Sequence, residues 1–274
     1  MKIAVVGGGI AGLMVAWMAA QEGHAVTLFE AESLGGGASG RALGVLVPVT
    51  GLDRPIDKLQ REGIGKWPGI ARQLAADSGS GGGNFWRAWG NERQQVRIPL
   101  IFGILRAAIE RHGGQVREGE PVTDVTALRR GFDMAVLAAG WGNAILGGQP
   151  MKLSAGLALR LRGAVDGLVC GDNLFVAPDW NDTVLAGSLN WDVAVPGDGA
   201  APEGKVKELR ARVGRLVPGL AGAEVIERWV GYRPVQAPRL PLVRPVADGV
   251  WAVAGLGKTG FALAPLLWDA LRPT

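Results

Sequence analysis

Three glycines near the N-terminus have the spacing that binds a dinucleotide. Gly7, Gly9 and Gly12 fit the pattern G-x-G-x-x-G, and Glu30 stands eighteen residues after the last of them. In this pattern the first glycine makes a tight turn, the second lets the backbone approach a pyrophosphate, and the third lets a helix pack closely on a strand. Glu30 can accept hydrogen bonds from a ribose, and an acid in its place favours a free 2′-hydroxyl over the 2′-phosphate of NADP.

The elements that must hold these residues follow from the surrounding pattern. The apolar run Lys2–Val6 is typical of a buried parallel strand, Ile10–Ala20 is predicted as a helix, and Ala25–Phe29 is predicted as a second strand. The helix would present unpaired N–H groups to the phosphates. A glycine-rich turn in an unrelated α/β protein is the alternative. The strand, the helix and the acid at the expected distance make the dinucleotide interpretation much stronger than the glycines alone.

Two more glycine-containing turns are placed to approach a bound group. Residues 31–48 include a loop of small residues in which Ser39 and Arg41 offer donors, although a flexible surface loop has a similar composition. Further on, Met134–Ala139 is predicted as a buried strand that ends at Gly140-Trp141-Gly142-Asn143. A strand that runs into such a turn is a second place where the backbone can approach a cofactor.

The pattern changes after Met151, where alternating apolar residues predict an antiparallel sheet. The last strand and helix return to the dinucleotide fold. The predicted class is therefore α/β, with a discontinuous Rossmann-like domain and an inserted antiparallel sheet. The other predicted elements are, in chain order, helices at Asp57–Ala76 and Pro99–His112, a strand pair within Gln115–Val125, strands at Leu153–Leu161, Leu174–Val176 and Thr183–Leu189, a helix at Pro202–Leu216, strands at Val225–Tyr232 and Gly249–Ala254, and a helix at Phe261–Leu271.

Composition and charge exclude several classes of protein. The 274 residues, 48% hydrophobic and 20% charged, are typical of a globular protein with one large or two modest domains. The net charge is +4, but the basic residues are scattered, so we predict no nucleic-acid partner. Cys170 is the only cysteine, which excludes an intramolecular disulfide and a cysteine metal cluster and favours the cytoplasm. We predict no metal site and, without eighteen consecutive apolar residues, no transmembrane helix.

Five motifs together carry a resemblance to one family, and the last two of them, in that order before a C-terminal helix, are specific together. The five motifs are Val5–Gly12 with Glu30, Gly37-Ala38-Ser39-Gly40 followed by Gly44, Val136–Gly140, Gly231-Tyr232-Arg233-Pro234 followed by Leu240-Pro241, and Gly255–Pro265. On these motifs the chain resembles, over nearly its whole length, the D-amino-acid oxidase and glycine oxidase family of flavoproteins. The Gly-Ala-Ser-Gly stretch and the terminal Ala-Pro also resemble the oxidase half of the bifunctional tRNA wobble-uridine modification enzyme.

The resemblance implies FAD, bound in an extended form. Its pyrophosphate would lie on Gly7–Gly12, its adenosine ribose on Glu30 and its adenine near the backbone of Val122. The isoalloxazine would lie between Ser39–Val45 and the Gly257–Phe261 turn. The implied FAD contacts are Gly7, Gly9, Ile10, Ala11, Gly12, Phe29, Glu30, Ala31, Ala38, Ser39, Gly40, Arg41, Gly44, Val45, Val122, Ala139, Gly140, Trp141, Arg233, Gly257, Lys258, Thr259, Gly260 and Phe261.

The resemblance also implies two catalytic residues, Arg233 and Lys258. Arg233 would hold a substrate carboxylate, because a guanidinium makes planar bidentate contacts; an arginine paired with an acid at the domain junction is the alternative. Lys258, with the positive N-terminus of the Phe261 helix, would face the flavin edge where negative charge develops during reduction. The alternative for Lys258 is a solvent-facing turn, and Arg41 is left open between a flavin contact and a surface charge.

The implied reaction is oxidation of the CH–NH bond of an amino acid or N-substituted glycine. Hydride would pass from the substrate Cα–H to flavin N5, the imine would hydrolyse, and O2 would reoxidise the flavin to give peroxide. Two alternatives stay open. One is a dehydrogenase that passes electrons to a quinone or a protein partner, and the other is a degenerate, non-catalytic flavin-binding protein. The sequence leaves the oligomeric state undetermined.

We predict an FAD-binding domain from residues 1–50, 98–150 and 236–274, and a substrate domain from residues 51–97 and 151–235. The substrate domain is reduced in size, because family members are commonly longer in the region of residues 51–97. Tyrosines that would bind a carboxylate cannot be assigned, because Tyr232 is the only tyrosine. The pocket is therefore predicted to be open, or rebuilt from tryptophans that are equally compatible with a place in the core: Trp86, Trp89, Trp180 and Trp191.

Overall fold

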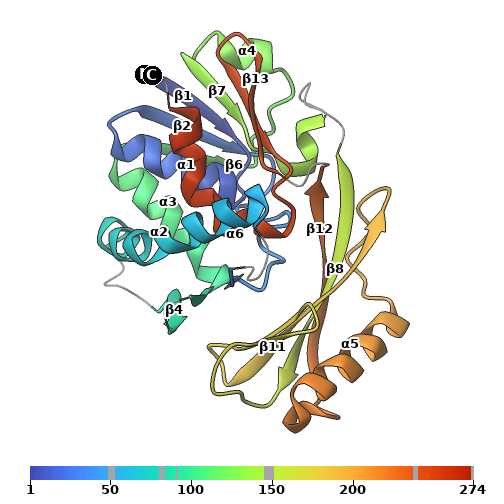
Figure 1. The fold of residues 1–274 in the computed structure, drawn as a ribbon. Coiled ribbons are helices and arrows are strands. Elements are labelled where there is room, and N and C mark those ends of the chain that lie inside the picture. The colour runs from blue at the N-terminus through green and yellow to red at the C-terminus, as the bar shows by residue number, and fades with distance from the viewer. Residues whose placement is uncertain (49–52, 80–83, 91, 145–150, 237–239, 273–274) are drawn as a thin grey trace.

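The computed structural model describes residues 1–48, 53–79, 84–90, 92–144, 151–236 and 240–272. Its strands form three sheets: one of six strands, one of five and one of three. Figure 1 shows the six-stranded sheet with its helices as one layered body, and the long strands of the five-stranded sheet running away from it. The predicted α/β class with an inserted antiparallel sheet is confirmed.

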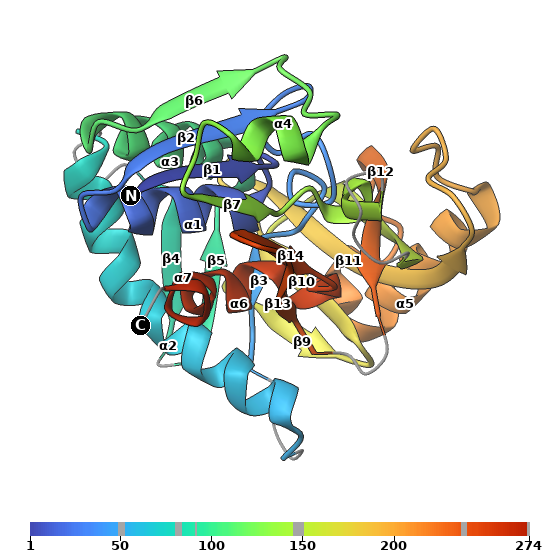
Figure 2. The same cartoon turned by 90° about the horizontal axis from the view of Figure 1, so that it is seen from above.

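The six-stranded sheet has the order β13-β14-β7-β1-β2-β6 and is parallel except for β13 at its edge. Its central strands are apolar runs buried on both faces, as parallel strands covered by helices must be. Figure 2 shows the sheet from above with its helices packed along it. The strands are β1 (Lys2–Val6), β2 (Ala25–Glu30), β6 (Gln115–Glu118), β7 (Met134–Leu137), β13 (Leu242–Ala247) and β14 (Val250–Ala254).

Helices α1 (Ile10–Gln21), α2 (Pro55–Asp77) and α3 (Ile98–Arg111) enclose the largest hydrophobic core against this sheet. Tryptophans from the first, second and last helices are fully buried there: Trp17, Trp67 and Trp268. The short helix α4 (Val125–Arg129) lies beside β7, near a smaller core cluster that includes Phe29 and Leu137. Because α2 shares the core of the six-stranded body, its packing favours placing residues 55–77 on that side; the division into domains stays a prediction.

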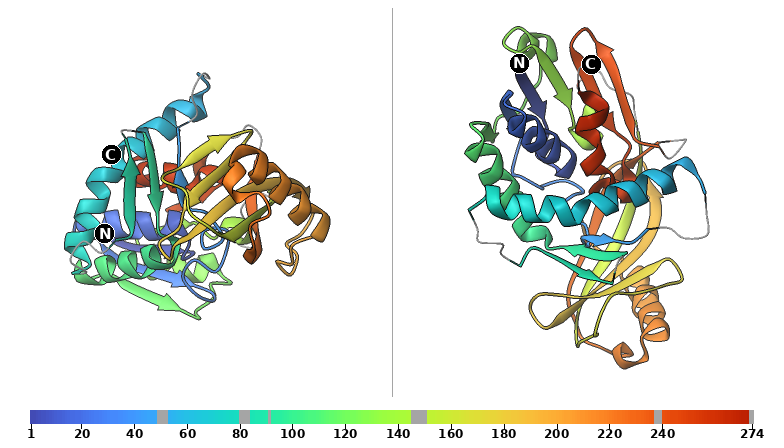
Figure 3. Two further views of the ribbon diagram at one scale, coloured as in Figure 1. Left: turned by 90° about the horizontal axis from the view of Figure 1, so that it is seen from below. Right: turned by 60° about the vertical axis from the view of Figure 1, so that its left-hand side comes forward.

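The five-stranded sheet is antiparallel, with the order β12-β8-β11-β10-β9. Alternate residues of its strands pack against helix α5 (Glu203–Leu216) and the short 3₁₀ turn η2 (Pro218–Leu220), and form a separate core. Figure 3 shows α5 covering one face of this sheet, so the other face is left for the six-stranded body. The strands are β8 (Lys152–Arg162), β9 (Val169–Gly171), β10 (Leu174–Pro178), β11 (Thr183–Val193) and β12 (Val225–Val235).

The small sheet lies between the two bodies and consists of β3 (Val45–Leu46), β4 (Trp86–Trp89) and β5 (Arg93–Val96), with β5 in the middle. Adjacent residues of β5 face opposite sides. Gln94 donates through Nε2 to the carbonyl of Ile64 in α2 at 3.2 Å, whereas Gln95 bonds with Arg87 of β4 on the other side. The hairpin was not predicted as strands, because its sequence is polar and carries no clear alternation.

Two predicted elements are wrong. The strand pair within Gln115–Val125 is one strand, β6, because Asp124 accepts a hydrogen bond from the amide of Ala127 at 2.9 Å and starts helix α4. The predicted helix Phe261–Leu271 is three short pieces: α6 (Gly260–Leu263), the 3₁₀ turn η4 (Ala264–Leu266) and α7 (Leu267–Leu271). Pro265 lies in the middle piece and lacks the amide that a continuous helix would use. Among the described residues, no helix is long and apolar enough to cross a membrane.

Candidate functional site

The glycines after β1 are required for two different reasons. Gly7 has φ +112°, and a Cβ there would lie 2.5 Å from the carbonyl oxygen of Ala138; a Cβ on Gly12 would collide with the carbonyl oxygen of Gly7. The protein itself therefore demands glycine at both positions. Gly9 has an ordinary φ of −76°, and within the described chain a Cβ would meet only Ser39 Oγ, at 3.2 Å. Room remains at Gly9 for another molecule to approach the backbone.

Glu30 ends β2 directly beside this glycine loop. Its Oε2 accepts a hydrogen bond from the amide of Gly8 at 2.6 Å, and its Oε1 accepts one from the amide of Glu32 at 3.0 Å. Each carboxylate oxygen can accept more than one hydrogen bond, so these contacts fix the carboxylate without exhausting it. The spacing in the sequence thus brought the acid to the loop, while its contact with a ribose stays a prediction.

The loop after β2 folds back over the start of α1. The amide of Gly35 donates to the carbonyl of Gly8, and the amide of Gly40 donates to the carbonyl of Gly35, both at 2.9 Å. Ser39 Oγ accepts from the amide of Ile10 at 3.1 Å, which occupies one of the free amides at the start of the helix. The hydroxyl keeps its own hydrogen to donate to a ligand that sits over this helix terminus.

The turn after β7 is fixed by a buried asparagine that the sequence did not single out. Asn143 lies in the 3₁₀ turn η1 (Gly140–Ala144) and is 1% exposed. Its Oδ1 accepts from the amide of Ala139 at 2.7 Å, and its Nδ2 donates to the carbonyls of Leu137 at 3.1 Å and Val253 at 3.0 Å. One side chain therefore joins β7, β14 and the turn at the edge where the glycine loop lies. Trp141, on the same turn, is 50% exposed.

The C-terminal turn also reaches the start of α1. It is the 3₁₀ segment η3 (Gly257–Thr259), where Thr259 Oγ1 donates to the carbonyl of Leu256 at 2.7 Å. A Cβ on Gly260 would lie 3.7 Å from Ile10 Cγ2, which places the predicted Lys258 turn beside the glycine loop. The helix that follows, α6, has four residues and is continued by η4 and α7, and the effect of its N-terminus on a flavin stays a prediction.

The substrate side of the candidate site is a glycine-rich face of the five-stranded sheet. On β12, alternation turns Trp229, Gly231 and Arg233 to one side. Trp229 Nε1 donates to the carbonyl of Arg41 at 2.9 Å, and a Cβ on Gly231 would lie 2.8 Å from Arg41 Cβ. The loop after β2 is thus held against this face. Arg41 meets the sheet through its backbone and Cβ, while its contact with a flavin stays a prediction.

The Arg233 side chain lies across Gly156 of β8, where a Cβ would collide with the guanidinium. Its Nη1 donates to Asn190 Oδ1 at 2.6 Å, and Ser188 Oγ donates to the same oxygen at 3.1 Å. Among the described residues, no carboxylate lies within 4.0 Å of this guanidinium, so the predicted alternative of a pair with an acid at the junction is not present there. Burial lowers the pKa of Arg233.

The end of β12 connects this face to the C-terminal turn. Val235 forms an isolated antiparallel bridge with Leu256, immediately before η3. Arg233 lies two residues before this bridge and Lys258 two residues after it, so both predicted catalytic residues are carried by the same junction. The glycine loop, the Ser39 loop, the two turns and Arg233 therefore converge on one region of the molecule.

A family model described as "FAD dependent oxidoreductase" matches residues 2–98 and 95–267. The chain belongs to this family. It is 24% identical to the glycine oxidase of Geobacillus kaustophilus across 96% of this chain and 90% of that protein. It is 26% identical to the glycine oxidase of Pseudomonas aeruginosa across 72% of this chain and 60% of that protein.

Solved structures show the same fold. The crystal structure of glycine oxidase from Geobacillus kaustophilus has a TM-score of 0.84 at 22% identity, covering 98% of this chain and 93% of that one. L-Proline dehydrogenase from P. horikoshii has a TM-score of 0.79 at 12% identity, covering 99% of this chain and 93% of that one. The resemblance inferred from the five motifs is thus confirmed, and the cofactor of this FAD-dependent oxidoreductase family is FAD.

The residues present fit FAD. The room above Gly9, the donor hydrogen of Ser39 and the carboxylate of Glu30 surround the start of α1, which is where a pyrophosphate and ribose would lie. The other predicted contacts of this half are close by: Ile10 and Ala11 are buried in α1, and Phe29, Val122 and Ala139 share one apolar cluster. Each residue's contact with FAD stays a prediction.

The four predicted pocket tryptophans are not gathered around Arg233. Trp191 packs in the core under α5, on the opposite face of the sheet, and Lys205 lies over its ring at 4.7 Å. Trp86 donates to Gln94 at 3.0 Å, and Trp89 lies against the turn at Gly167. Instead, Asn190 and Ser188 accompany Arg233. Asn190 reaches this face because the register of β11 shifts between Gly187 and Leu189, whereas strict alternation from Val184 would have turned it towards α5.

Proposed function

We infer that this oxidoreductase acts on the CH–NH bond of a small amine that carries a carboxylate, an amino acid or an N-substituted glycine, with O2 as the electron acceptor. Arg233 carries the proposal. It is a partly buried guanidinium whose described hydrogen-bond partner is the neutral oxygen of Asn190. A cation so placed is stabilised by an anionic ligand, and a carboxylate matches the planar donors of a guanidinium.

The surface around Arg233 supports a small ligand. Gly156 of β8 is paired with Gly231 of β12, and Gly187 of β11 is paired with Ala158, two residues along β8 on the same face, so glycine and alanine line this part of the sheet. Leu43 rests on Gly187, where a Cβ would lie 3.0 Å from Leu43 Cδ1, and marks one boundary of the face. We propose that the substrate lies on this surface.

The protein's own residues then have distinct tasks. FAD, when bound, supplies the hydride acceptor. Arg233 would bind the substrate carboxylate and orient the amine-bearing carbon, and Asn190 holds the guanidinium in place. Lys258 would stabilise negative charge from the C-terminal turn. The relatives named glycine oxidase support an amino-acid substrate.

The proposal is tested by peroxide formation. FAD-loaded protein is incubated in air with N-methylglycine, which has both an amine and a carboxylate, with methylamine, which has only the amine, and with acetate, which has only the carboxylate. Peroxide with N-methylglycine alone, in proportion to amine consumed, is the expected result. Oxidation that reduces a quinone dye without peroxide would instead support the dehydrogenase alternative, whose fold is also seen in L-proline dehydrogenase. The single, partly buried Cys170 is in keeping with the cytoplasmic location that we propose.

A further inference from the structure

A buried amide in the small sheet lacks a partner for its hydrogens. Gln95 is 0% exposed, and its Oε1 accepts from Arg87 Nε at 3.0 Å and Arg87 Nη2 at 2.7 Å. A guanidinium has only donors, so the amide cannot be turned round, and Nε2 is the group that faces away. Gln95 Nε2 has no hydrogen-bond partner among the described residues, and leaving such a donor unpaired in a protein interior is costly.

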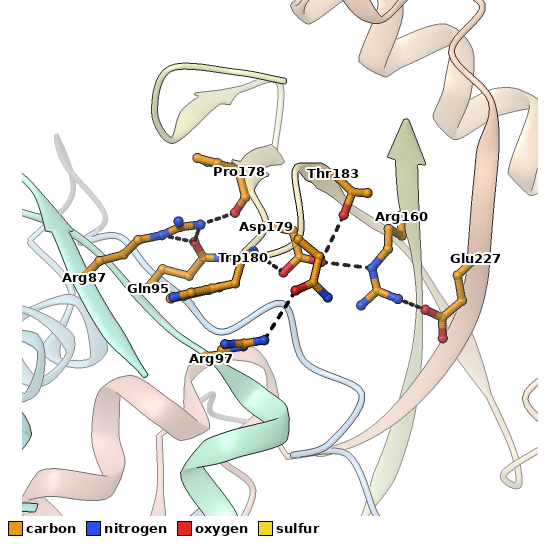
Figure 4. A network of polar contacts seen from close by, with 10 residues as sticks. Arg87, Gln95, Arg97, Arg160, Pro178, Asp179, Trp180, Thr183 and Glu227 are labelled. Carbon is orange, nitrogen blue, oxygen red and sulfur yellow. Dashed lines mark hydrogen bonds and ion pairs between the residues drawn. The ribbon is translucent and has the colours of Figure 1, made fainter. Parts of the chain in front are cut away.

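A second unpaired donor lies beside it. Figure 4 shows Trp180 between Arg87 and Arg97, whose guanidinium carbons lie 3.8 Å and 5.8 Å from the ring centroid. Trp180 Nε1 is buried and, in the part of the chain described, has no hydrogen-bond partner. Gln95 and Trp180 both contact the Arg87 guanidinium, so the two residues that carry unpaired donors belong to one cluster.

The side chains of this cluster carry a net charge of +1. It holds three guanidinium groups, from Arg87, Arg97 and Arg160, and two carboxylates, from Asp179 and Glu227. Three cations less two anions give +1. The surplus is shared by Arg87 and Arg97, because the described acceptors of Arg87 are the neutral oxygens of Gln95 and Pro178 and that of Arg97 is the neutral Oδ1 of Asn181. Arg160, by contrast, is paired with both carboxylates.

Asp179 offsets the charge of Arg87 only through space, because its described hydrogen bonds come from Arg160, Thr183 and the amide of Trp180. Its Oδ1 accepts from the amide of Trp180 at 2.8 Å, and its Oδ2 accepts from Arg160 Nε at 2.9 Å and Thr183 Oγ1 at 3.2 Å. Burial lowers the pKa of Arg87, nearby Arg97 lowers it further, and Asp179 opposes both effects. An additional anion would therefore stabilise the cluster.

Gln95 also connects the cluster to the candidate FAD site. In the small sheet it is paired with Val45 of β3, a predicted isoalloxazine contact, and with Arg87 of β4 on its other side. Residues paired across neighbouring strands share a face, so Val45, Gln95 and Arg87 form a row from the predicted flavin to the turn between β10 and β11.

We propose that Gln95 Nε2 and Trp180 Nε1, with the Arg87 guanidinium, form a binding site for one carboxylate. A carboxylate supplies a single negative charge and two acceptor oxygens, which match the surplus positive charge and two unpaired donors. The carboxylate is either a distal group of the amine substrate or a separate small carboxylic acid. Only the first of these sources depends on the function proposed above.

The test follows the indole N–H signals of the ¹⁵N-labelled, FAD-loaded protein during titration with sodium acetate, against sodium chloride at equal ionic strength. Trp180→Phe assigns the Trp180 signal and keeps an aromatic ring beneath Arg87. We expect acetate, and not chloride, to move the Trp180 signal along a saturable curve. The Trp86 signal is the internal control and should stay in place, because its Nε1 already donates to Gln94 at 3.0 Å.

Gln95→Glu is the matched variant. It keeps an acceptor for Arg87, removes the unpaired donor and supplies a resident carboxylate, so acetate affinity should fall by at least about tenfold. A Trp180 signal that ignores acetate up to about 100 mM, the result expected if an ordered water fills the site, overturns the proposal. So does an acetate response that Gln95→Glu leaves unchanged. Neither result touches the reaction at Arg233, because this titration requires no turnover.

Kinetics with paired amines then identify the source of the carboxylate. If Gln95→Glu raises KM about tenfold for N-carboxyalkyl glycines and leaves KM for N-alkyl glycines unchanged, the site holds the distal group of the substrate. If KM is unchanged for both series while acetate still binds the wild-type protein, the site takes a separate carboxylic acid. Each result supports the binding site and separates its two sources.

Discussion

The Arg233 guanidinium lies directly across Gly156, so that a side chain on Gly156 would occupy the space that the guanidinium now fills. The two residues sit on neighbouring strands, β12 and β8, and Gly156 is paired with Gly231. The guanidinium of Arg233 therefore packs on the backbone of Gly156, in the space that a side chain would fill at an ordinary sheet position. This relationship makes the position of the proposed carboxylate-binding group depend on a glycine elsewhere in the sheet.

We predict that Gly156→Ala displaces Arg233 without unfolding the protein, because the added methyl group meets the flexible end of a side chain. The KM for carboxylated amines should rise by about tenfold or more, with a smaller effect on kcat. Gly204→Ala, in an open position on α5, is the control and should leave KM unchanged. Equal KM values in Gly156→Ala and the wild type would show that substrate binding does not depend on the packing of Arg233 against Gly156.

Arg233→Ala removes the guanidinium itself. Binding of carboxylated amines should weaken by about 2–5 kcal/mol, the range lost when one partner of a desolvated charge pair is removed. Methylamine, which has no carboxylate, should be handled no worse by the variant than by the wild type. If the variant lost both kinds of amine equally, Arg233 would have a structural role instead.

Alanine substitutions at Gly9 and Gly12 should have different effects, because a methyl group meets different neighbours at the two positions. Gly9→Ala is expected to fold but to bind FAD at least about tenfold more weakly, because its methyl group enters the space left for the pyrophosphate. Gly12→Ala should lose stability as well, since its methyl group collides with the backbone of Gly7. Gly65→Ala, in an open position on α2, is the neutral control. A fully yellow Gly9→Ala protein with unchanged FAD affinity would contradict the assignment.

Asn143 should matter for stability as much as for the site. Asn143→Leu leaves the amide of Ala139 and the carbonyls of Leu137 and Val253 without their partner, which should cost about 2–4 kcal/mol in the free energy of unfolding. Urea denaturation measures this cost. Gly142→Ala, in the same turn with only Ala139 Cβ near it, should unfold close to the wild-type midpoint. A stable Asn143→Leu protein would mean that the turn is held by other contacts.

The carboxylate of Asp77, far from the candidate site, should make the free energy of unfolding depend on pH. Burial raises the pKa of Asp77, but hydrogen bonds from His112, Trp17 and Gln21 outweigh it and leave that pKa below its ordinary value of 3.8. The carboxylate therefore contributes stability above pH ~3.8 that is lost as pH falls through the lower folded pKa.

Asp77→Asn should accordingly destabilise the protein at pH 7 by about 1–3 kcal/mol, and the difference from wild type should shrink below pH ~4. Thermal unfolding at several pH values measures it. Asp172→Asn, whose carboxylate is 74% exposed, is the matched control and should change little. A difference between Asp77→Asn and wild type that stayed constant down to pH ~2 would contradict this account.

The first thirty residues were predictable because local pattern and fold agree there. An apolar run, three glycines, a helix and an acid each have one physical reason, and β1, α1 and β2 lie where the pattern placed them. The second strand after β6 failed because the side chain of Asp124 caps a helix that alternation cannot reveal. The terminal helix failed at Pro265, whose missing amide interrupts an otherwise apolar helical run.

The residues around Arg233 were harder to predict from the sequence. Arg233 was predicted because it lies in a motif. Its packing against Gly156 and its hydrogen bond to Asn190, however, depend on strand pairings between residues far apart in the chain. The tryptophans were weighed for a pocket by their type alone, and the register of β11 turned Trp191 to the α5 side. Long-range register decides which side chains meet, and no local pattern carries it.

The most direct test is anaerobic reduction of the bound flavin. FAD-loaded protein is mixed without oxygen with glycine, N-methylglycine, or D- or L-alanine, and flavin absorbance is followed in a stopped-flow instrument. We predict that at least one of these amines bleaches the flavin at a rate that saturates with amine concentration, and that Gly156→Ala shifts this curve to higher concentration. A flavin that stays oxidised with every carboxylated amine of a broad panel would contradict the proposed oxidation of a CH–NH bond.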